Sequence, residues 1–195
     1  MIDGDAILIE GETLTKVGKI SDADIRTSDL VIDACGTIAI PGLIDSHVHI
    51  TFGDFTPRQN TVGYLQSYLH GGVTTSISAS EVHVPGRPSD PDGVKALAIA
   101  ANKCFEKYRP GGMRVHAGSV IMEPGLSEED YQEVRDKGVW LAKAGFGAVL
   151  SAQEYIPMVA MAKKAGLLTT LHTGGASIPG SFPITGEDLI RIDPD

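Results

Sequence analysis

From residue 37 to the end of the chain, short apolar segments alternate with amphipathic segments, and this alternation constrains the fold most. The apolar segments are "TIAIPGLIDSHVH", "VTTSISAS", "MRVHAGSVI", "VWLAKAGFGAV" and "LLTTLHTGG". The segments that follow them, 57–72, 90–108, 126–138, 152–166 and 185–192, have helical character. Strands that alternate with helices predict a parallel sheet with helical crossovers. A doubly wound open sheet and a (β/α)8 barrel both fit this pattern, and a barrel of eight units would be incomplete here.

Two local signals refine the predicted helices. Ser127 precedes three acidic residues and is expected to cap the helix that follows it. Pro157 is expected in the first turn of its helix, where a missing N–H removes no helical hydrogen bond.

Residues 1–36 differ from the rest of the chain. "DAILIEGETLTKVGKI" and "DLVIDACG" predict short strands separated by Gly and Asp turns, and no helical periodicity is evident there. The sequence therefore predicts two domains, 1–36 and 37–195.

Charge and composition exclude several classes of partner. Sixteen basic and twenty-five acidic side chains give a net charge of −9, which argues against a nucleic-acid partner. No apolar run approaches the ~20 residues of a membrane helix, and the acidic N-terminus does not resemble a signal peptide. Cys35 and Cys104 form no close motif, which favours free thiols in a reducing compartment. We expect a cytoplasmic protein without a membrane partner.

His47 and His49 stand one residue apart at the end of the first apolar segment. Side chains at positions i and i+2 of a strand lie on the same face, so the two imidazoles are expected to be neighbours. Such a pair can bind one divalent metal such as zinc. Alternatively, both histidines end a buried strand and bond to backbone, and the spacing alone leaves both interpretations open.

Other polar residues follow the ends of the predicted strands, where the functional groups of parallel α/β folds gather. They are Ser78 and Ser80 with His83 beyond them, His116, Lys143 and His172. Lys143 lies between apolar segments, and a buried ammonium is costly without a partner, although a strand-end lysine can also extend its amine to water. Histidines and a lysine at three strand ends favour a functional site over coincidence.

At these residues the chain resembles a known family, the amidohydrolase superfamily. The resemblance is carried by "PGLIDSHVH", "GGVTTSI", the strand-end lysine and "LHTGG". The longer stretches "GDFTPRQNT", "HGGVTTSISA", "HVPGRPSD" and "HTGGASIPGS" are similar to the enamidases of that superfamily, which open a cyclic enamide in nicotinate breakdown. The resemblance implies a distorted (β/α)8 TIM barrel beside a small β-sandwich. Residues 1–36 would then be part of the β-sandwich, and residues 37–195 the first five βα units of the barrel.

The resemblance also implies a site with two divalent metal ions, either zinc alone or zinc with iron. His47 and His49 match the pair that holds the more buried metal, and His172 matches a ligand of the second metal. Lys143 matches the position that bridges both metals when it is carboxylated. Enamidases carry a glutamate there, in a segment one residue longer. A gap beside Trp140 aligns Lys143 with that glutamate, whereas an ungapped alignment places Ala144 there.

The reaction implied by the resemblance is hydrolysis of a C–N bond in a cyclic amide, with metal-activated hydroxide attacking the carbonyl carbon. The general acid/base aspartate and one further histidine are expected beyond Asp195, so no catalytic residue is expected within this span. We therefore expect a fragment of a longer enzyme that forms a homo-oligomer. A mononuclear deaminase of the same superfamily and a non-catalytic barrel fragment are the alternatives.

The expected substrate is a small carboxylated lactam. Arg58, Arg87 and His83 follow the first two barrel strands and are expected to contact it, because a guanidinium suits bidentate binding of a carboxylate. The alternative for each arginine is a surface salt bridge to Asp54 or Asp90. For His116, ordinary packing is favoured over a substrate contact.

Overall fold

The computed structural model describes residues 6–50, 64–80, 86–174 and 182–195. The chain divides into two compact units, Met1–Ile40 and Pro41–Asp195, each of which is described by itself. In the described part of the chain, no helix is both long enough and apolar enough to cross a membrane.

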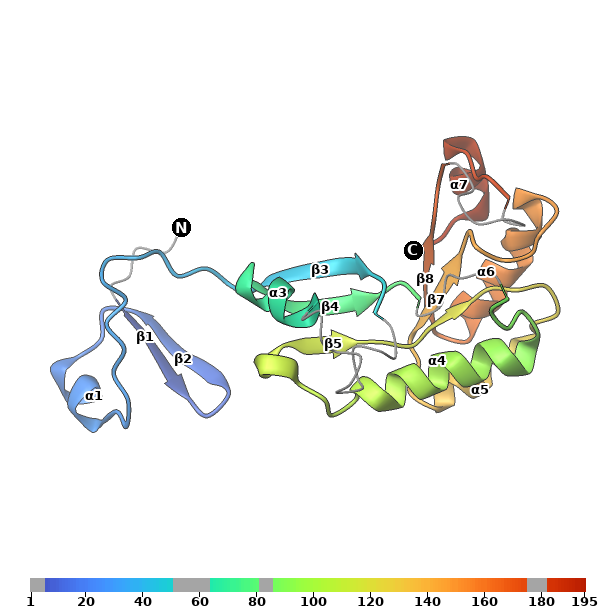
Figure 1. Ribbon diagram of the computed structural model, residues 1–195. Helices are drawn as coiled ribbons and strands as arrows, with labels where there is room; N and C mark the ends of the chain where they lie inside the picture. The colour runs from blue at the N-terminus through green and yellow to red at the C-terminus, as the bar shows by residue number, and fades with distance from the viewer. Residues whose placement is uncertain (1–5, 51–63, 81–85, 175–181) are drawn as a thin grey trace. The chain divides into compact units, whose positions relative to one another are not determined.

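The first unit is a two-stranded hairpin followed by a short helix (Figure 1). β1 (Ala6–Glu10) and β2 (Thr13–Gly18) form within the first segment predicted to contain short strands, and they pair antiparallel. The prediction that this region has no helix is wrong, because α1 spans Asp22–Thr27. Its signal is a capping box in which Ser21 Oγ accepts from Asp24 N and Asp24 Oδ2 accepts from Ser21 N.

The strand predicted for "DLVIDACG" is also absent from the structure. Leu30, Val31 and Ile32 have an apolar, β-branched composition, but they are exposed. A strand needs a hydrogen-bonded neighbour, and no described strand pairs with this segment.

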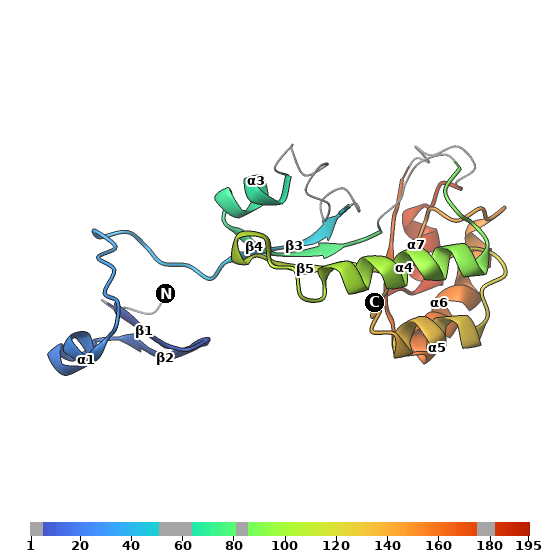
Figure 2. The ribbon, with the colours of Figure 1, turned by 60° about the horizontal axis from the view of Figure 1, so that its bottom comes forward.

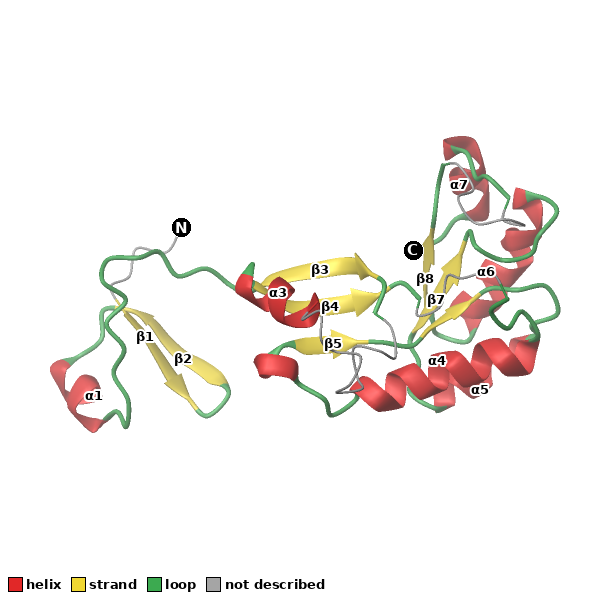
Figure 3. Cartoon of the chain, in the orientation of Figure 1, coloured by secondary structure: helices red, strands yellow, loops and turns green. Residues whose placement is uncertain are grey.

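The second unit contains two parallel three-stranded sheets (Figure 3). The first contains β3 (Leu43–Val48), β4 (Val73–Ser78) and β5 (Arg114–His116), and the second contains β6 (Ser119–Ile121), β7 (Leu141–Ala144) and β8 (Leu168–Leu171). Within each sheet the strands follow chain order, and every pair is parallel. The predicted parallel α/β architecture is confirmed, although β3 begins only after Pro41, which has no N–H to donate.

Five helices follow the strands, and all five were predicted with wider bounds. They are α3 (Tyr64–His70), α4 (Pro91–Phe105), α5 (Glu128–Asp136), α6 (Tyr155–Lys164) and α7 (Gly186–Ile192). Residues 57–63 of the first predicted helix lie outside the described residues. Ser127 forms the predicted cap of α5, as part of a capping box with Asp130, and Pro157 lies in the first turn of α6.

"MRVHAGSVI" was predicted as one strand but contributes to both sheets. The chain leaves β5 at Ala117–Gly118 and re-enters as β6. Gly118 has a φ of +99°, and a Cβ there would lie 2.6 Å from the carbonyl oxygen of Ala98 on α4. The strand therefore breaks where α4 lies close to its backbone. A tertiary contact of this kind is not visible in the apolar pattern of the sequence.

Helix α4 packs against both sheets (Figure 2). Val94 and Ala98, near its N-terminal end, belong to the apolar core formed with β6, β7 and the helices α5–α7. Ala101 and Phe105, two turns later, belong to the core formed with β3, β5 and α3. One helix thus packs against both sheets and helps to fix their strands relative to one another.

Candidate metal centre

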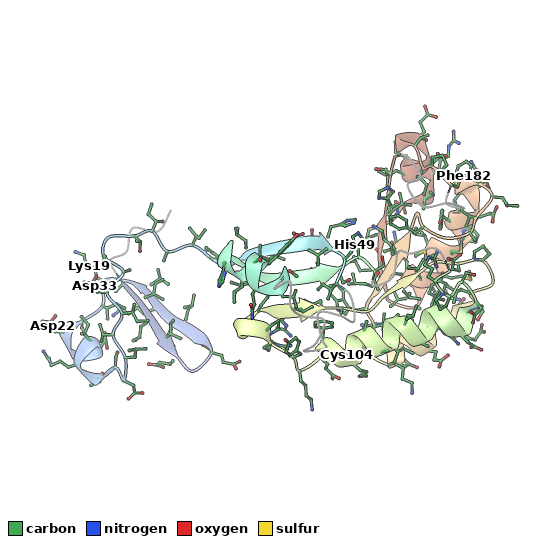
Figure 4. The ribbon with its side chains drawn as sticks, viewed as in Figure 1. Lys19, Asp22, Asp33, His49, Cys104 and Phe182 are labelled. Atoms are coloured by element: carbon green, nitrogen blue, oxygen red, sulfur yellow. The ribbon has the colours of Figure 1, made fainter. Side chains whose placement is uncertain are left out.

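The histidine pair lies at the carboxyl end of β3, where Figure 4 labels His49. His47 is on the strand and His49 follows it, while Val48 between them is buried in the core. This alternation leaves both imidazoles on the same face, with ring centroids 5.3 Å apart and an interplanar angle of 77°. His47 N donates a hydrogen bond to Asp45 Oδ1 at 3.0 Å within β3, where the register with β4 shifts between Asp45 and Val48.

The backbone of the neighbouring strand selects the tautomer of His49. Its Nδ1 lies 3.2 Å from the carbonyl oxygen of Ser80, just beyond the end of β4. A carbonyl oxygen only accepts, so Nδ1 must carry the proton and donate it. In the neutral ring, the lone pair is then on Nε2, in the arrangement typical of metal-binding histidines.

Lys143 meets the histidine pair from the other sheet. Its side chain is on β7 and is completely buried, so the alternative in which its amine reaches water is wrong. Nζ lies 3.5 Å from His47 Nε2. Burial lowers the pKa of Lys143 to about 8, because an ammonium in an apolar environment is poorly solvated.

The surroundings also favour neutral imidazoles. Burial lowers the pKa of His47, and the positive charge of Lys143 lowers it further. Burial is likewise the main cause of the lowered pKa of His49, to which Lys143 and His172 add. A metal ligand must offer a free lone pair, so near neutral pH both rings are in the form that binds metal.

His172 follows β8 directly and packs against an aromatic side chain that the sequence analysis missed. The rings of His172 and Phe146 are 4.8 Å apart, and Lys143 Nζ lies 5.7 Å from the Phe146 ring centroid. Gly145 permits this approach, because a Cβ there would lie 2.8 Å from the Cβ of His172. Phe146 therefore lies close to both the lysine and the third histidine.

Arg87 is held by other residues of this unit. Its Nη2 donates to Glu123 Oε1 and, at 2.5 Å, to the carbonyl oxygen of Phe146, while Nη1 donates to Pro88 O at 3.1 Å. Among the described residues, the acidic partner of Arg87 is Glu123 and not Asp90, while Asp54 lies outside the described residues. The sequence analysis missed Glu123, although an acid two residues beyond an apolar strand was a usable signal.

Of the other residues considered for substrate contact, two are not described by the structure and one is. Arg58 and His83 lie outside the described residues. His116 is described, and its ring packs edge-on against Trp140 at 5.4 Å, with burial lowering its pKa. This contact agrees with the favoured interpretation of His116 as a packing residue.

Comparison with protein families accounts for these side chains together. The model of the amidohydrolase family matches residues 38–180, a span that includes the histidine pair, Lys143 and His172. The chain belongs to the amidohydrolase family.

Curated relatives agree with this assignment. The chain is 44% identical over 199 aligned residues to the enamidase of Eubacterium barkeri, covering all of this chain and 51% of that protein. It is 27% identical to a dihydroorotase of Methanosarcina acetivorans over 167 residues, covering 85% of this chain and 34% of the relative. The chain thus spans about half the length, or less, of these relatives.

The fold comparison gives the same result. The crystal structure of enamidase, a member of the amidohydrolase superfamily, matches all of this chain and 51% of its own with a TM-score of 0.86 at 44% identity. The second unit is therefore part of the TIM-barrel fold of that superfamily, incomplete in these residues.

Amidohydrolases generally bind divalent metals, and the side chains at the β3 and β7 ends fit such an ion. Among the described residues, no three His, Cys, Asp or Glu side chains cluster closely enough to hold a metal by themselves. The donor set is instead a histidine pair with a buried lysine at 3.5 Å. Two imidazoles with available lone pairs and an amine of lowered pKa are chemically suited to a divalent cation.

Proposed function

We propose that this amidohydrolase is a metal-dependent hydrolase that cleaves the C–N bond of a cyclic amide. The observation that carries the proposal is the meeting of Lys143 with the His47–His49 pair at the carboxyl ends of parallel strands. The identity of 44% to an enamidase over the whole chain supports the same reaction class.

Two divalent ions, zinc or zinc with iron, complete the proposed site. His47 and His49 would hold one ion, His172 would hold the other, and Lys143, once carboxylated, would serve as a ligand to both. When bound, the ions supply Lewis acidity and a water molecule of lowered pKa. The geometry supports His49 as a ligand in particular, because its Nδ1 is committed to Ser80 and its Nε2 is available.

The residues around the metals have separate proposed roles. Phe146 is buried beside Lys143 and His172 and excludes water from that side. Arg58 and His83 are proposed to recognise the carboxylate of a lactam substrate, whereas the guanidinium of Arg87 is already engaged by Glu123.

The remaining parts of the proposal concern the whole protein. We infer that residues 1–36 contribute to a small β-sandwich and that the protein is a cytoplasmic homo-oligomer. Cys35 and Cys104 are both free, which supports a reducing compartment.

The test uses the full-length protein loaded with zinc and a six-membered lactam that carries a carboxylate. Ring opening is expected, with loss of activity on chelation, recovery on adding zinc, and two metal ions per chain by elemental analysis. One metal per chain together with ammonia release would favour the deaminase alternative. Two bound metals without opening of any cyclic amide tested would contradict the proposed reaction.

A further inference from the structure

A buried acid lies behind the candidate site rather than in it. Glu123 and Lys143 are the two charged side chains buried completely in the described part of the chain. Glu123 stands two residues beyond β6, at the same end of the sheet as Lys143 on β7. A buried carboxylate is destabilising unless its charge and its oxygens are satisfied, so its partners indicate its purpose.

Both carboxylate oxygens of Glu123 are engaged. Oε1 accepts from Arg87 Nη2, and Oε2 accepts from the backbone N–H of Ala148 at 2.6 Å. The same Arg87 nitrogen donates to the carbonyl oxygen of Phe146. The ion pair therefore holds the backbone on both sides of Gly147, one bond to the preceding residue and one to the following residue. The Arg87 side chain itself is only 10% exposed.

Gly147 is held from a further direction. Its N–H donates to the Tyr155 hydroxyl at 2.8 Å. A Cβ at this position would lie 2.2 Å from the carbonyl oxygen of Met122 and 3.0 Å from the Tyr155 hydroxyl. The 146–148 segment is thus packed closely against the residue that follows β6, and there is little space for an alternative backbone conformation.

The held segment carries Phe146, whose ring contacts the site. That ring is 4.8 Å from the ring of His172 and within cation–π distance of Lys143. A shift of the segment would move the ring and so change the surroundings of both side chains.

We propose that Arg87 and Glu123 form a positioning clamp that fixes the 146–148 segment and, through Phe146, the orientations of His172 and Lys143. Arg87 then acts on the reaction through the protein, and its guanidinium is not free for a substrate carboxylate. The catalytic part of this inference rests on the hydrolase function proposed above. The structural part does not.

Hydrogen exchange of the full-length protein tests the structural part. The variants are Glu123→Ala, Glu123→Gln and Arg87→Lys. The control is Lys164→Ala, which removes an exposed ion pair with Glu128 on the outer helices (2.7 Å). In peptides that cover residues 144–150, Glu123→Ala is expected to speed amide exchange about ten- to a hundredfold, the scale of a lost hydrogen bond to a charged group. Glu123→Gln should have a smaller effect, because its amide oxygen can still accept from Ala148.

Lys164→Ala should leave exchange in this segment unchanged. If Glu123→Ala does not fold, Glu123→Gln and Arg87→Lys decide the matter. Unchanged exchange at 144–150 in folded Glu123 and Arg87 variants would overturn the clamp, as would an increase of equal size in Lys164→Ala.

Kinetics separate the clamp from direct substrate binding. For a clamp, Glu123→Gln and Arg87→Lys should lower kcat by similar factors on a carboxylated lactam and on its neutral amide analogue. A loss confined to KM for the carboxylated lactam, in Arg87→Lys but not in Glu123→Gln, would overturn the positioning role. Absence of hydrolysis in the wild-type protein would refute the proposed function alone, because the exchange result still decides the clamp.

Discussion

Lys143 Nζ lies 3.5 Å from His47 Nε2, although the two residues are 96 positions apart in the sequence and belong to different sheets. The contact places a buried amine beside the histidine pair where the carboxyl ends of the two sheets meet. Helix α4 packs against both sheets, so it supports the two elements that carry this contact.

The buried amine predicts an unusual dependence of stability on pH. The pKa of Lys143 falls from 10.5 in the unfolded chain to about 8 in the folded one. Between these values the unfolded chain binds a proton that the native chain does not, so the free energy of unfolding rises with pH through this window. Below pH 8 the buried amine is protonated in the folded chain, and the full destabilisation that this burial causes is present.

Lys143→Met removes this penalty while keeping an apolar side chain of similar length. In metal-free protein, the stability of Lys143→Met relative to wild type should fall by roughly 3 kcal/mol between pH 7 and pH 11. Denaturant unfolding in the presence of a chelator, at several pH values, measures the difference. Parallel pH profiles for the two proteins would show that Lys143 is not desolvated.

Metal binding should depend on the histidine pair. In the full-length protein, His47→Ala and His49→Ala are each expected to lose bound metal and nearly all hydrolysis while the circular dichroism spectrum is kept, because each removes a ligand from the proposed centre. His116→Gln is the matched control, since His116 packs against Trp140 and should leave the metal content unchanged. Full metal content in both alanine variants would end the binuclear interpretation.

Local sequence signals predicted the parallel α/β fold because strands and helices each leave a periodic pattern. The sequence also correctly predicted Ser127 as the cap of α5 and Pro157 in the first turn of α6. The division of β5 from β6 could not be predicted, because it arises where α4 approaches Gly118. A contact between segments that are distant in sequence has no local pattern.

The candidate site shows the same limit. The spacing of His47 and His49 predicted that their side chains share one face, because the alternation of side chains along a strand is a local property. The burial of Lys143 and the use of His49 Nδ1 by Ser80 depend on neighbouring strands. The partner of Arg87 is 36 residues away in the sequence, and aspartates nearer to Arg87 were the more obvious candidates.

Gly147 should tolerate no side chain. In Gly147→Ala, the new Cβ would meet the carbonyl oxygen of Met122 at 2.2 Å, so the segment must shift. We expect a loss of about 1–3 kcal/mol in unfolding free energy, the usual cost of overpacking. Gly186→Ala is the control, because nothing lies within 4 Å of a Cβ there. Equal stability of the two variants in denaturant unfolding would contradict the packing described for Gly147.

Arg58 offers a direct test of substrate recognition. If its guanidinium binds the substrate carboxylate, Arg58→Ala should lose about 1.5–3 kcal/mol of transition-state binding, or roughly ten- to a hundredfold in kcat/KM, on a carboxylated lactam. The loss on the neutral amide analogue should be much smaller. Steady-state kinetics on both substrates decide this, and equal losses would remove Arg58 from the proposed binding site.

The last prediction is that Lys143 is carboxylated in the metal-loaded protein. Its lowered pKa makes a neutral amine accessible, and two nearby cations would disfavour the ammonium further. The neutral nitrogen can attack the carbon of carbon dioxide and release one proton, which gives a carbamate whose two oxygens can bridge two metals. Lys143→Ala should therefore lose the metal pair, and millimolar acetate or formate should restore part of the activity by supplying a carboxylate in the vacated space. Lys143→Glu should keep some activity without any addition, whereas acetate should not rescue His47→Ala, which lacks a ligand rather than the bridge. Electron density of the metal-loaded protein gives the direct observation, and a bare amine outside coordinating distance of both metals would place the bridge on another residue.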